Sequence, residues 1–272
     1  MAKEPKKAPD FAREADLCAA FVAALARPRR RYEPEVDDWI VYPETADFDL
    51  LLVRRSDGAQ IGVEAKLRLN PQVVCQALPD WKWAPVVEGP DYRAVLVPWS
   101  ATDLGMGEIC AALGITVIRV SPTDIRGTGD GPSFSPLLPV SDRRSREREW
   151  FEWCPDRRCK LPDYVPDVAA GVAAPTKLTE WKIAAIKLAI IMTDRPATRA
   201  DFVALDLSPS RWMQNPGAWL QKVDGGWLPG PYMPDFRKQH PVNFAQIEAD
   251  KAAWMPPGPA VAATAMKQAA LL

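Results

Sequence analysis

The spacing of apolar residues in the first part of the chain predicts a helix followed by strands. Residues 11–27 carry apolar side chains at helical intervals, and Pro28 ends this segment. A short apolar run at 39–41 follows. Two runs rich in aliphatic residues, 48–53 and 61–67, then flank a Ser-Asp-Gly turn. This pattern is typical of a β-hairpin whose loop contains glycine.

The alternation of helical and strand patterns continues to residue 120. A helix is predicted from 71 to 81, with Asn70 as its N-cap and proline in its first turn. Two further strands and the helix between them are predicted at 92–98, 115–120 and 103–113, the helix closing at Gly114. The predicted order is α-β-β-β-α-β-α-β, which indicates an α/β fold.

Three charged residues stand out in the otherwise apolar hairpin. Asp49 opens its first strand, and Glu64 and Lys66 lie two residues apart on the second, so we expect the latter two on one face of the sheet. Asp47 shares the predicted face of Asp49 and is an alternative to it. Charges at such a place are costly unless they are paired or hold a metal. An ordinary cross-strand ion pair on an exposed face is the simpler interpretation.

Asp49 and the Glu64-Ala65-Lys66 tripeptide, set in this order of elements, resemble the PD-(D/E)XK nuclease superfamily over residues 10–122. The resemblance implies a restriction-endonuclease-like mixed β-sheet flanked by helices. It also implies hydrolysis of DNA phosphodiester bonds with Mg²⁺, for which Mn²⁺ can substitute. Asp49, Glu64 and the backbone carbonyl of Ala65 would hold the metal, and Lys66 would orient the attacking water. Phe48 stands where the older form of the motif has proline.

The resemblance suggests two further site residues. Many members use a glutamate of the first helix as a metal ligand, which points to Glu14, with Asp16 as its rival. Several use a glutamine on the helix after the lysine, and Gln76 fits this catalytic role better than Gln72. A solvated acid and a surface glutamine are the alternatives.

Composition limits the partners. The chain has 272 residues, of which 47% are hydrophobic, and a formal net charge of −1, so no overall positive field attracts nucleic acid. Contacts with DNA would have to come from local patches such as Arg29, Arg30 and Arg31. No segment has the pattern of a membrane span or a signal peptide, so we expect a cytoplasmic protein that uses no membrane.

The few histidine and cysteine residues argue against a histidine-activated nucleophile and against a zinc site. The single histidine, His240, has no motif that ties it to a nucleophile, and we expect it in a loop. Cys18, Cys75 and Cys110 are predicted to be small buried side chains. Cys154 and Cys159 make at best half of a zinc site.

The organisation changes after residue 122. Residues 123–175 are rich in proline and glycine around a charged segment, and we interpret them as a connector that partly packs on the first domain. A helical domain is predicted at 176–240 and a peripheral tail at 241–272. The tail could also form a partner-binding helix.

The predicted helical domain has helices at 178–192, 198–205 and 208–222, followed by a hairpin turn. This helix order resembles a winged helix-turn-helix domain. The resemblance implies that Arg211 and Gln214 of the third helix enter the major groove of DNA. Pro216 lies within that helix and argues against a regular recognition helix. A helical module that binds a second copy of the chain or another protein is the alternative.

Together these patterns predict a Mg²⁺-dependent deoxyribonuclease with a C-terminal domain that positions substrate or a partner. The alternative is a catalytically inactive protein that keeps the nuclease fold and binds nucleic acid or protein. The eleven tryptophans favour this alternative slightly, because tryptophan is enriched at interfaces.

Overall fold

The computed structural model describes the chain over residues 9–27, 38–78, 86–101, 103–125, 131–140, 149–171, 177–213 and 217–256. The chain divides into two units, each with its own core. Unit 1 comprises Met1–Leu161 and Val168–Lys177, and unit 2 comprises Pro162–Asp167 and Leu178–Leu272. Most of the proline- and glycine-rich segment after residue 122 therefore belongs to unit 1.

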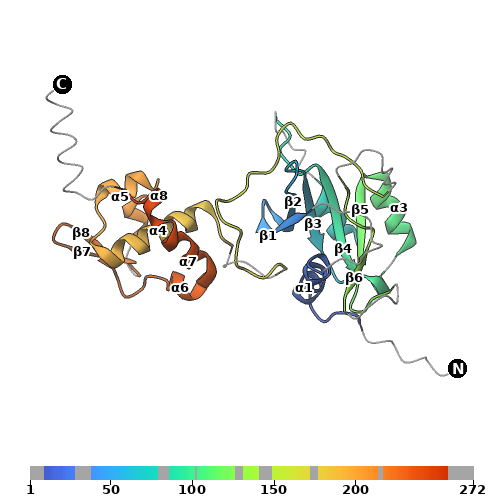
Figure 1. Cartoon of the computed structure of the whole chain (residues 1–272), viewed down its shortest axis with the longest axis horizontal. Helices are drawn as coiled ribbons and strands as arrows, with labels where there is room; N and C mark the ends of the chain where they lie inside the picture. The colour runs from blue at the N-terminus through green and yellow to red at the C-terminus, as the bar shows by residue number, and fades with distance from the viewer. Residues whose placement is uncertain are drawn as a thin grey trace. The chain divides into compact units, whose positions relative to one another are not determined.

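Unit 1 is built on a six-stranded mixed sheet in which the strands follow one another in chain order, β1 to β6 (Figure 1). The first three strands form an antiparallel meander, β4 and β5 continue it in parallel, and β6 returns antiparallel. The strands are β1 (Trp39–Thr45), β2 (Phe48–Arg54), β3 (Gln60–Ala65), β4 (Tyr92–Pro98), β5 (Ile115–Ser121) and β6 (Ser133–Ser135). Strand β6 was not predicted from the sequence.

In the described part of unit 1, one α-helix precedes the strands, and two further α-helices and a 3₁₀ turn connect them. They are α1 (Glu14–Leu25), α2 (Pro71–Ala77), the turn η1 (Trp99–Ala101) and α3 (Leu104–Ala112). The side chain of Asn70 accepts the N–H of Val73, which confirms the predicted cap of α2. Gly114 follows α3 with a φ of 69°, the left-handed conformation expected of a glycine that closes a helix. The predicted order of elements up to residue 120 is thus confirmed.

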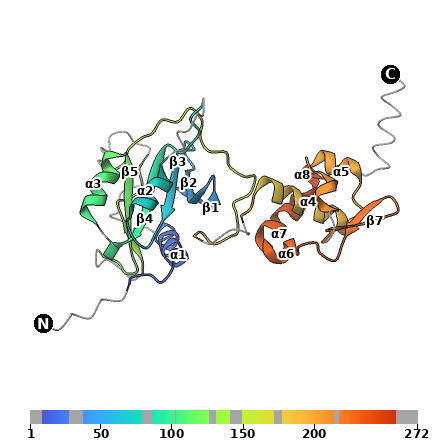
Figure 2. The ribbon, with the colours of Figure 1, turned by 180° about the vertical axis from the view of Figure 1, so that it is seen from behind.

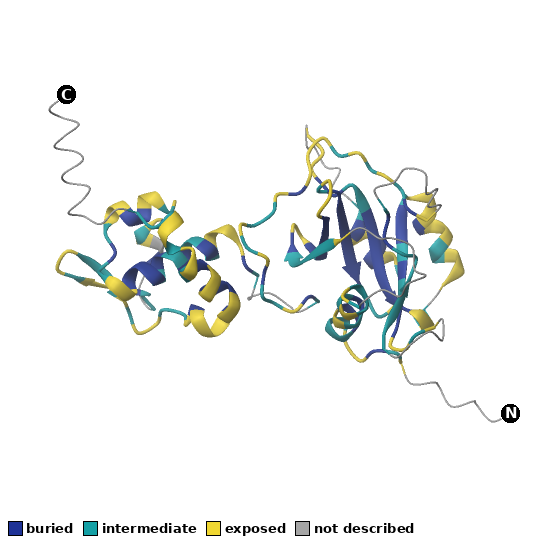
Figure 3. Ribbon diagram, viewed as in Figure 1, coloured by how far each residue is buried: buried dark blue, intermediate teal, exposed yellow. Residues whose placement is uncertain are grey.

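The central strands β2, β3 and β4 are buried on both faces (Figure 3), whereas β1 and β6 are half-buried, and alternation along the central strands divides the core in two. Leu17 and Phe21 of α1 pack with one set of strand residues, which includes Leu50 and Leu96. Helices α2 and α3 cover the other face and pack with a set that includes Val95. Seen from behind, α2 and α3 lie on the side of the sheet away from α1 (Figure 2).

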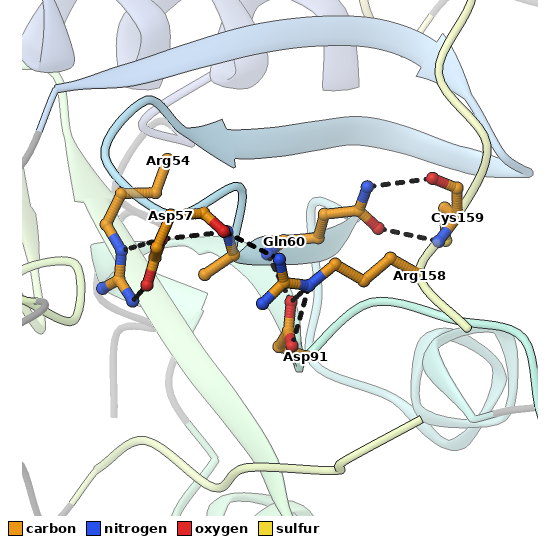
Figure 4. A network of polar contacts seen from close by, with 7 residues as sticks. Arg54, Asp57, Gln60, Asp91, Arg158 and Cys159 are labelled. Atoms are coloured by element: carbon orange, nitrogen blue, oxygen red, sulfur yellow. Dashed lines mark hydrogen bonds and ion pairs between the residues drawn. The ribbon is translucent and has the colours of Figure 1, made fainter. Parts of the chain in front are cut away.

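A segment of extended chain, residues 149–161, is held against unit 1 by side-chain hydrogen bonds (Figure 4). Gln60, the first residue of β3, bonds both backbone groups of Cys159 at 2.9 and 2.8 Å. Arg158 pairs with Asp91, whose carboxylate also accepts the N–H of Gln60. This network lies at the hairpin end of β2 and β3, where β3 begins.

Unit 2 contains five helices, a 3₁₀ turn and a two-stranded hairpin within the residues that the structure describes. Its longest helix, α4, begins after Thr179, which accepts the N–H of Lys182, and buries Ile183, Ile186 and Ile190. The elements are α4 (Glu180–Asp194), α5 (Arg199–Ala204), the turn η2 (Pro209–Trp212), β7 (Leu220–Val223), β8 (Gly226–Pro229), α6 (Phe236–Gln239), α7 (Pro241–Ala249) and α8 (Lys251–Trp254).

The predicted third helix at 208–222 is wrong. Among the described residues of this segment, 208–213 and 217–222, only the 3₁₀ turn η2 is helical, and residues 220–222 belong to strand β7. Trp212 is buried and packs edge-on against Phe202 and Trp219, so it belongs to the core of unit 2. The side chain of Arg211 and the whole of Gln214 lie outside the described residues.

Residues beyond 240 contribute more to unit 2 than a tail would. Helix α7 buries Phe244 and Ile247 in the core of the unit. His240, expected in a loop, lies between α6 and α7 and is fully buried, with its Nδ1 2.9 Å from Oδ1 of Asp167. Asp167 also accepts the N–H groups of Val242 and Asn243, so it joins residues 162–167 to the start of α7.

The cysteines are free thiols in the structure. Cys18 and Cys110 are buried as predicted, whereas Cys75 is exposed because α2 turns only its Val73, Val74 and Ala77 face inward. Cys154 is exposed and Cys159 buried. No helix in the described part of the chain is long and apolar enough to cross a membrane.

Candidate active site

The three charged residues of the hairpin come together at one end of the sheet. Leu50 pairs with Val63 across β2 and β3, so Asp49, just before Leu50, lies beside Glu64, just after Val63. Lys66 follows β3, and its N–H donates to the carbonyl of Leu96 on β4 at 3.0 Å. The charge of Asp49 raises the pKa of Glu64, and the charge of Lys66 lowers the pKa of both carboxyl groups.

Asp49 is held by the backbone of the neighbouring strand. Its Oδ2 accepts the N–H of Ala65 at 2.8 Å. Burial raises the pKa of Asp49, while the Ala65 N–H and the charge of Lys66 act in the opposite direction. The carboxyl group therefore has one fixed oxygen, and no hydrogen bond joins its Oδ1 to a residue that the structure describes.

Glu64 is the most unusual residue of the site. Its side chain is 5% exposed, yet it makes no hydrogen bond or ion pair with any residue that the structure describes. Burial raises the pKa of Glu64 to about 8, and the nearby charge of Asp49 adds to the effect. A buried carboxyl group without a partner is destabilising unless a cation or a proton compensates it.

Lys66 is paired with the first helix. Its Nζ lies 2.9 Å from Oε2 of Glu14, which stands in the first turn of α1. Desolvation lowers the pKa of Lys66, but the hydrogen bond to Glu14 and the charges of Glu14, Asp49 and Glu64 outweigh it and raise the pKa overall. Lys66 is therefore a fixed ammonium group at neutral pH.

The structure distinguishes the predicted site residues from their rivals. Asp16 pairs with exposed Arg13 on the surface of α1, whereas Glu14 reaches the site. Asp47 is exposed in the turn between β1 and β2, whereas Asp49 is half-buried. Gln76 is exposed on α2, and no hydrogen bond in the described structure joins it to the other site residues.

Two residues that the sequence analysis did not single out lie beside this site. Glu44, at the end of β1, is 8% exposed, and its Oε2 lies 3.6 Å from Nζ of Lys177. The charge of Glu44 raises the pKa of Glu64, and the charge of Lys177 lowers it. The residue type alone gave no signal for either one. A glutamate and a lysine from distant segments become neighbours only through the fold.

A buried thiol completes the surroundings of the site. Burial raises the pKa of Cys18, and the negative charges of Asp49, Glu44 and Glu14 raise it further. Cys18 therefore stays protonated and acts as part of the apolar packing beneath the carboxylates.

The donor set fits a hard divalent cation. Within the described residues no three His, Cys, Asp or Glu side chains are grouped so that they could hold a metal ion alone. Mg²⁺ commonly binds through one or two carboxylates, with water and substrate phosphate completing its coordination. Asp49 and Glu64 supply such a pair, and the unpartnered buried carboxyl group of Glu64 is the observation that favours a cation.

The predicted arginine contacts with DNA cannot be placed on the fold. Arg29, Arg30 and Arg31 lie outside the described residues, as does the charged stretch at 141–148. Comparison with protein-family models, with curated proteins and with solved structures gave no match for this chain. The functional argument therefore rests on the residues of the site.

Proposed function

We propose that the protein is a Mg²⁺-dependent deoxyribonuclease that hydrolyses phosphodiester bonds at Asp49, Glu64 and Lys66. The observation that carries this proposal is the buried Glu64 carboxyl group, which lies beside Asp49 and Lys66 without a hydrogen-bond partner among the described residues. If Glu64 had only a structural role, a neutral or ion-paired side chain would be more stable at its position. Binding of a divalent cation would explain why an ionisable group occurs there.

The arrangement of strands supports a restriction-endonuclease-like core. A helix, an antiparallel meander of three strands, a second helix and a parallel fourth strand follow one another in the order that the superfamily resemblance implies. The acids lie on the second and third strands of the meander. Cytoplasmic location and DNA as substrate belong to the same proposal.

In this mechanism Asp49 and Glu64 would hold the cation, with Glu14 and the carbonyl of Ala65 as further ligands by the resemblance. The cation, when bound, would stabilise negative charge on the phosphate and make water a better nucleophile. Glu64 would release its proton as the cation binds, since the pKa of the free carboxyl group is about 8.

Lys66 would orient the attacking water by donating a hydrogen bond to its oxygen. The contact with Glu14 holds the ammonium group in place and keeps it charged. Attack of water on phosphorus would form one P–O bond as the water gives up a proton to solvent. The bond to the 3′ oxygen would break, and this oxygen would leave with a proton from solvent. Gln76 remains a predicted accessory residue, although its exposed position does not add support.

Unit 2 would position DNA or a protein partner, including a second copy of the chain. Two helices followed by the β7–β8 hairpin retain part of the winged-helix order. The short 3₁₀ turn in place of a third helix weakens the case for a recognition helix at Arg211 and Gln214. For unit 2, binding of a protein partner is therefore as well supported as sequence-specific binding of DNA.

The test is incubation of the protein with linear, circular and single-stranded DNA in Mg²⁺ and in EDTA. We expect Mg²⁺-dependent cleavage by the wild type and by Lys160→Ala, an exposed lysine of unit 1, and none by Lys66→Ala. The circular substrate separates internal cutting from digestion at ends. Normal cleavage by Lys66→Ala would contradict the assignment, and an inert wild type would favour the non-catalytic binding module.

A further inference from the structure

The segment Val168–Lys177 carries a second lysine to the acidic site, from a part of unit 1 that is far from the hairpin in sequence. Gly171 donates its N–H to Oε1 of Glu44 at 2.9 Å. At the end of the segment, Nζ of Lys177 lies 3.6 Å from the other carboxylate oxygen of Glu44. One glutamate thus contacts both described ends of this segment.

The fit of this segment against α1 is close. Gly171 has a φ of 72°, and a Cβ at this position would lie 3.1 Å from the backbone nitrogen of Ala15 and 3.2 Å from the carbonyl carbon of Glu14. Glycine therefore suits this position both for its conformation and for its size. The tight contact places the segment beside the turn of helix from which Glu14 reaches Lys66.

Glu44 stands beside a tight turn. Glu44, Ala46 and Asp47 all have positive φ angles, of 48°, 53° and 64°, although none of them is glycine. Such conformations are uncommon for residues with a side chain and persist where the surroundings enforce them. Positive φ at Ala46 and Asp47 is what the two-residue turn between β1 and β2 requires. The unusual conformation is therefore that of Glu44, which lies within β1 and contacts Gly171 and Lys177.

Lys177 is held more loosely than Lys66. Its ammonium group is 3.6 Å from its carboxylate partner and its side chain is 34% exposed, compared with 2.9 Å and 21% for Lys66. A distance of 3.6 Å is longer than a good hydrogen bond, so the ammonium group can turn to another anion at little cost. Lys177 is nevertheless near enough for its charge to lower the pKa of both Asp49 and Glu64.

The charge balance of the site calls for such a residue. Once Glu64 has released its proton, as the proposed cation site requires, the carboxylates of Glu14, Glu44, Asp49 and Glu64 would repel an approaching phosphodiester. One divalent cation together with Lys66 and Lys177 would balance four carboxylates and allow a phosphate to approach.

We infer that Lys177 binds a phosphate of the DNA backbone beside the scissile bond, and that Glu44 is a positioning residue that holds Lys177 there. This inference rests on the proposed function, since DNA is the substrate in both. It adds a substrate contact to the three residues of the hairpin motif. Lysine serves here as a point charge that recognises the phosphate without reading sequence.

The test measures binding and cleavage separately. Binding of a labelled DNA duplex is followed by fluorescence anisotropy in Ca²⁺ over a range of salt concentrations, for the wild type, Lys177→Ala, Lys177→Arg and Lys160→Ala. We expect Lys177→Ala to weaken binding about three- to tenfold and to reduce the slope of log K against log salt by about 0.9, as loss of one phosphate contact predicts. Lys177→Arg should restore most of the affinity, and Lys160→Ala should match the wild type.

Cleavage in Mg²⁺ distinguishes the two proposals. Lys177→Ala should raise KM while kcat stays within about twofold, as expected for uniform binding to a phosphate that does not itself react, and Glu44→Gln should show a smaller change in the same direction. Unchanged affinity and salt slope in Lys177→Ala, or absence of DNA binding by the wild type, would overturn the role of Lys177. Binding that depends on Lys177 without cleavage by the wild type would support the phosphate contact and refute hydrolysis.

Discussion

The ammonium group of Lys66 lies 2.9 Å from a carboxylate oxygen of Glu14, and this contact joins the end of β3 to the first turn of α1. The two side chains are 21% and 33% exposed, so the pair is shielded from solvent only in part. A pair of this kind contributes little to stability, about 1 kcal/mol or less. Its importance lies in fixing the position and the charge of the lysine.

Replacement of Glu14 should therefore affect catalysis more than folding. We expect Glu14→Gln to reduce DNA cleavage about tenfold or more, because a misplaced catalytic group costs rate steeply. The pKa of Lys66 should also fall, because the hydrogen bond to Glu14 raises it, so the activity should decline at a lower pH on the alkaline side. Asp16→Asn is the matched control, since Asp16 pairs with exposed Arg13 in the same turn of helix. Equal effects of both variants would contradict the role assigned to Glu14.

Glu64 should destabilise the metal-free protein at alkaline pH. Burial raises the pKa of Glu64 from its ordinary value of 4.5 to about 8, so its charged form is favoured in the unfolded chain. The free energy of unfolding should fall as pH rises from about 4.5 to about 8 and then level off. Glu64→Gln removes this loss, and we expect about 1–3 kcal/mol of added stability at pH 9 and almost none at pH 5.

Thermal unfolding in EDTA at several pH values measures this effect. Glu149→Gln makes the same change at an exposed position and should leave the melting temperature unchanged throughout. A gain in Glu64→Gln that is equal at pH 5 and pH 9 would show that the carboxyl charge is not its cause.

Gly62 should be sensitive to the addition of a single methyl group. A Cβ at this position would lie 2.5–2.8 Å from ring atoms of Phe48, the residue that precedes Asp49. We expect Gly62→Ala to lower the free energy of unfolding by about 1–3 kcal/mol through overpacking. Cleavage should fall as well, because Asp49 moves with its neighbour. Gly107→Ala in α3, where nothing lies within 4 Å of the added Cβ, should instead stabilise the protein by about 0.5–1 kcal/mol. Urea unfolding of both variants and the wild type measures the two changes.

Asp201 should be the most important polar residue of unit 2. It is 1% exposed, accepts two hydrogen bonds of 2.7 Å from Arg195, and caps α5 together with Thr198. Burial opposes its charge, but the hydrogen bonds from Arg195 and Thr198 outweigh burial and lower the pKa of Asp201. Its contribution to stability is therefore present above its ordinary pKa of 3.8 and is lost as the pH falls through the lower folded-state pKa.

We expect Asp201→Asn to cost about 2–4 kcal/mol at pH 7, since it leaves Arg195 without its charged partner. Urea unfolding followed by tryptophan fluorescence measures this loss, because Trp212 packs against the neighbouring Phe202. Exposed Asp206, replaced by asparagine, should change stability by less than about 0.5 kcal/mol. A similar small change in Asp201→Asn would refute the structural role of the pair.

The meeting of the three charged hairpin residues could be predicted because they are close together in the sequence. Asp49, Glu64 and Lys66 lie on two strands joined by one turn, so the strand pattern alone brings them together. Glu14 could be proposed only through the family resemblance, and the structure then placed it on Lys66. The helices and strands of unit 1 were predictable for a similar reason, since aliphatic runs, the Asn70 cap and Gly114 are local signals.

The remaining features depend on tertiary contacts that leave no local signal. Glu44 reaches the site from a turn in which non-glycine residues have positive φ angles, and the sequence does not indicate this conformation. Lys177 becomes a neighbour only because Gly171 packs on α1. The prediction of a third helix in unit 2 fails because residues 220–223 pair with β8, and this strand pairing prevails over the helical spacing of apolar residues.

Titration of the protein with Mn²⁺ by isothermal calorimetry tests the central claim most directly, namely that Asp49 and Glu64 together bind one divalent cation. The account predicts a saturable heat for the wild type and for Glu149→Gln, and loss of that heat in Glu64→Gln. An undiminished heat in Glu64→Gln, or no saturable heat in the wild type, would contradict it.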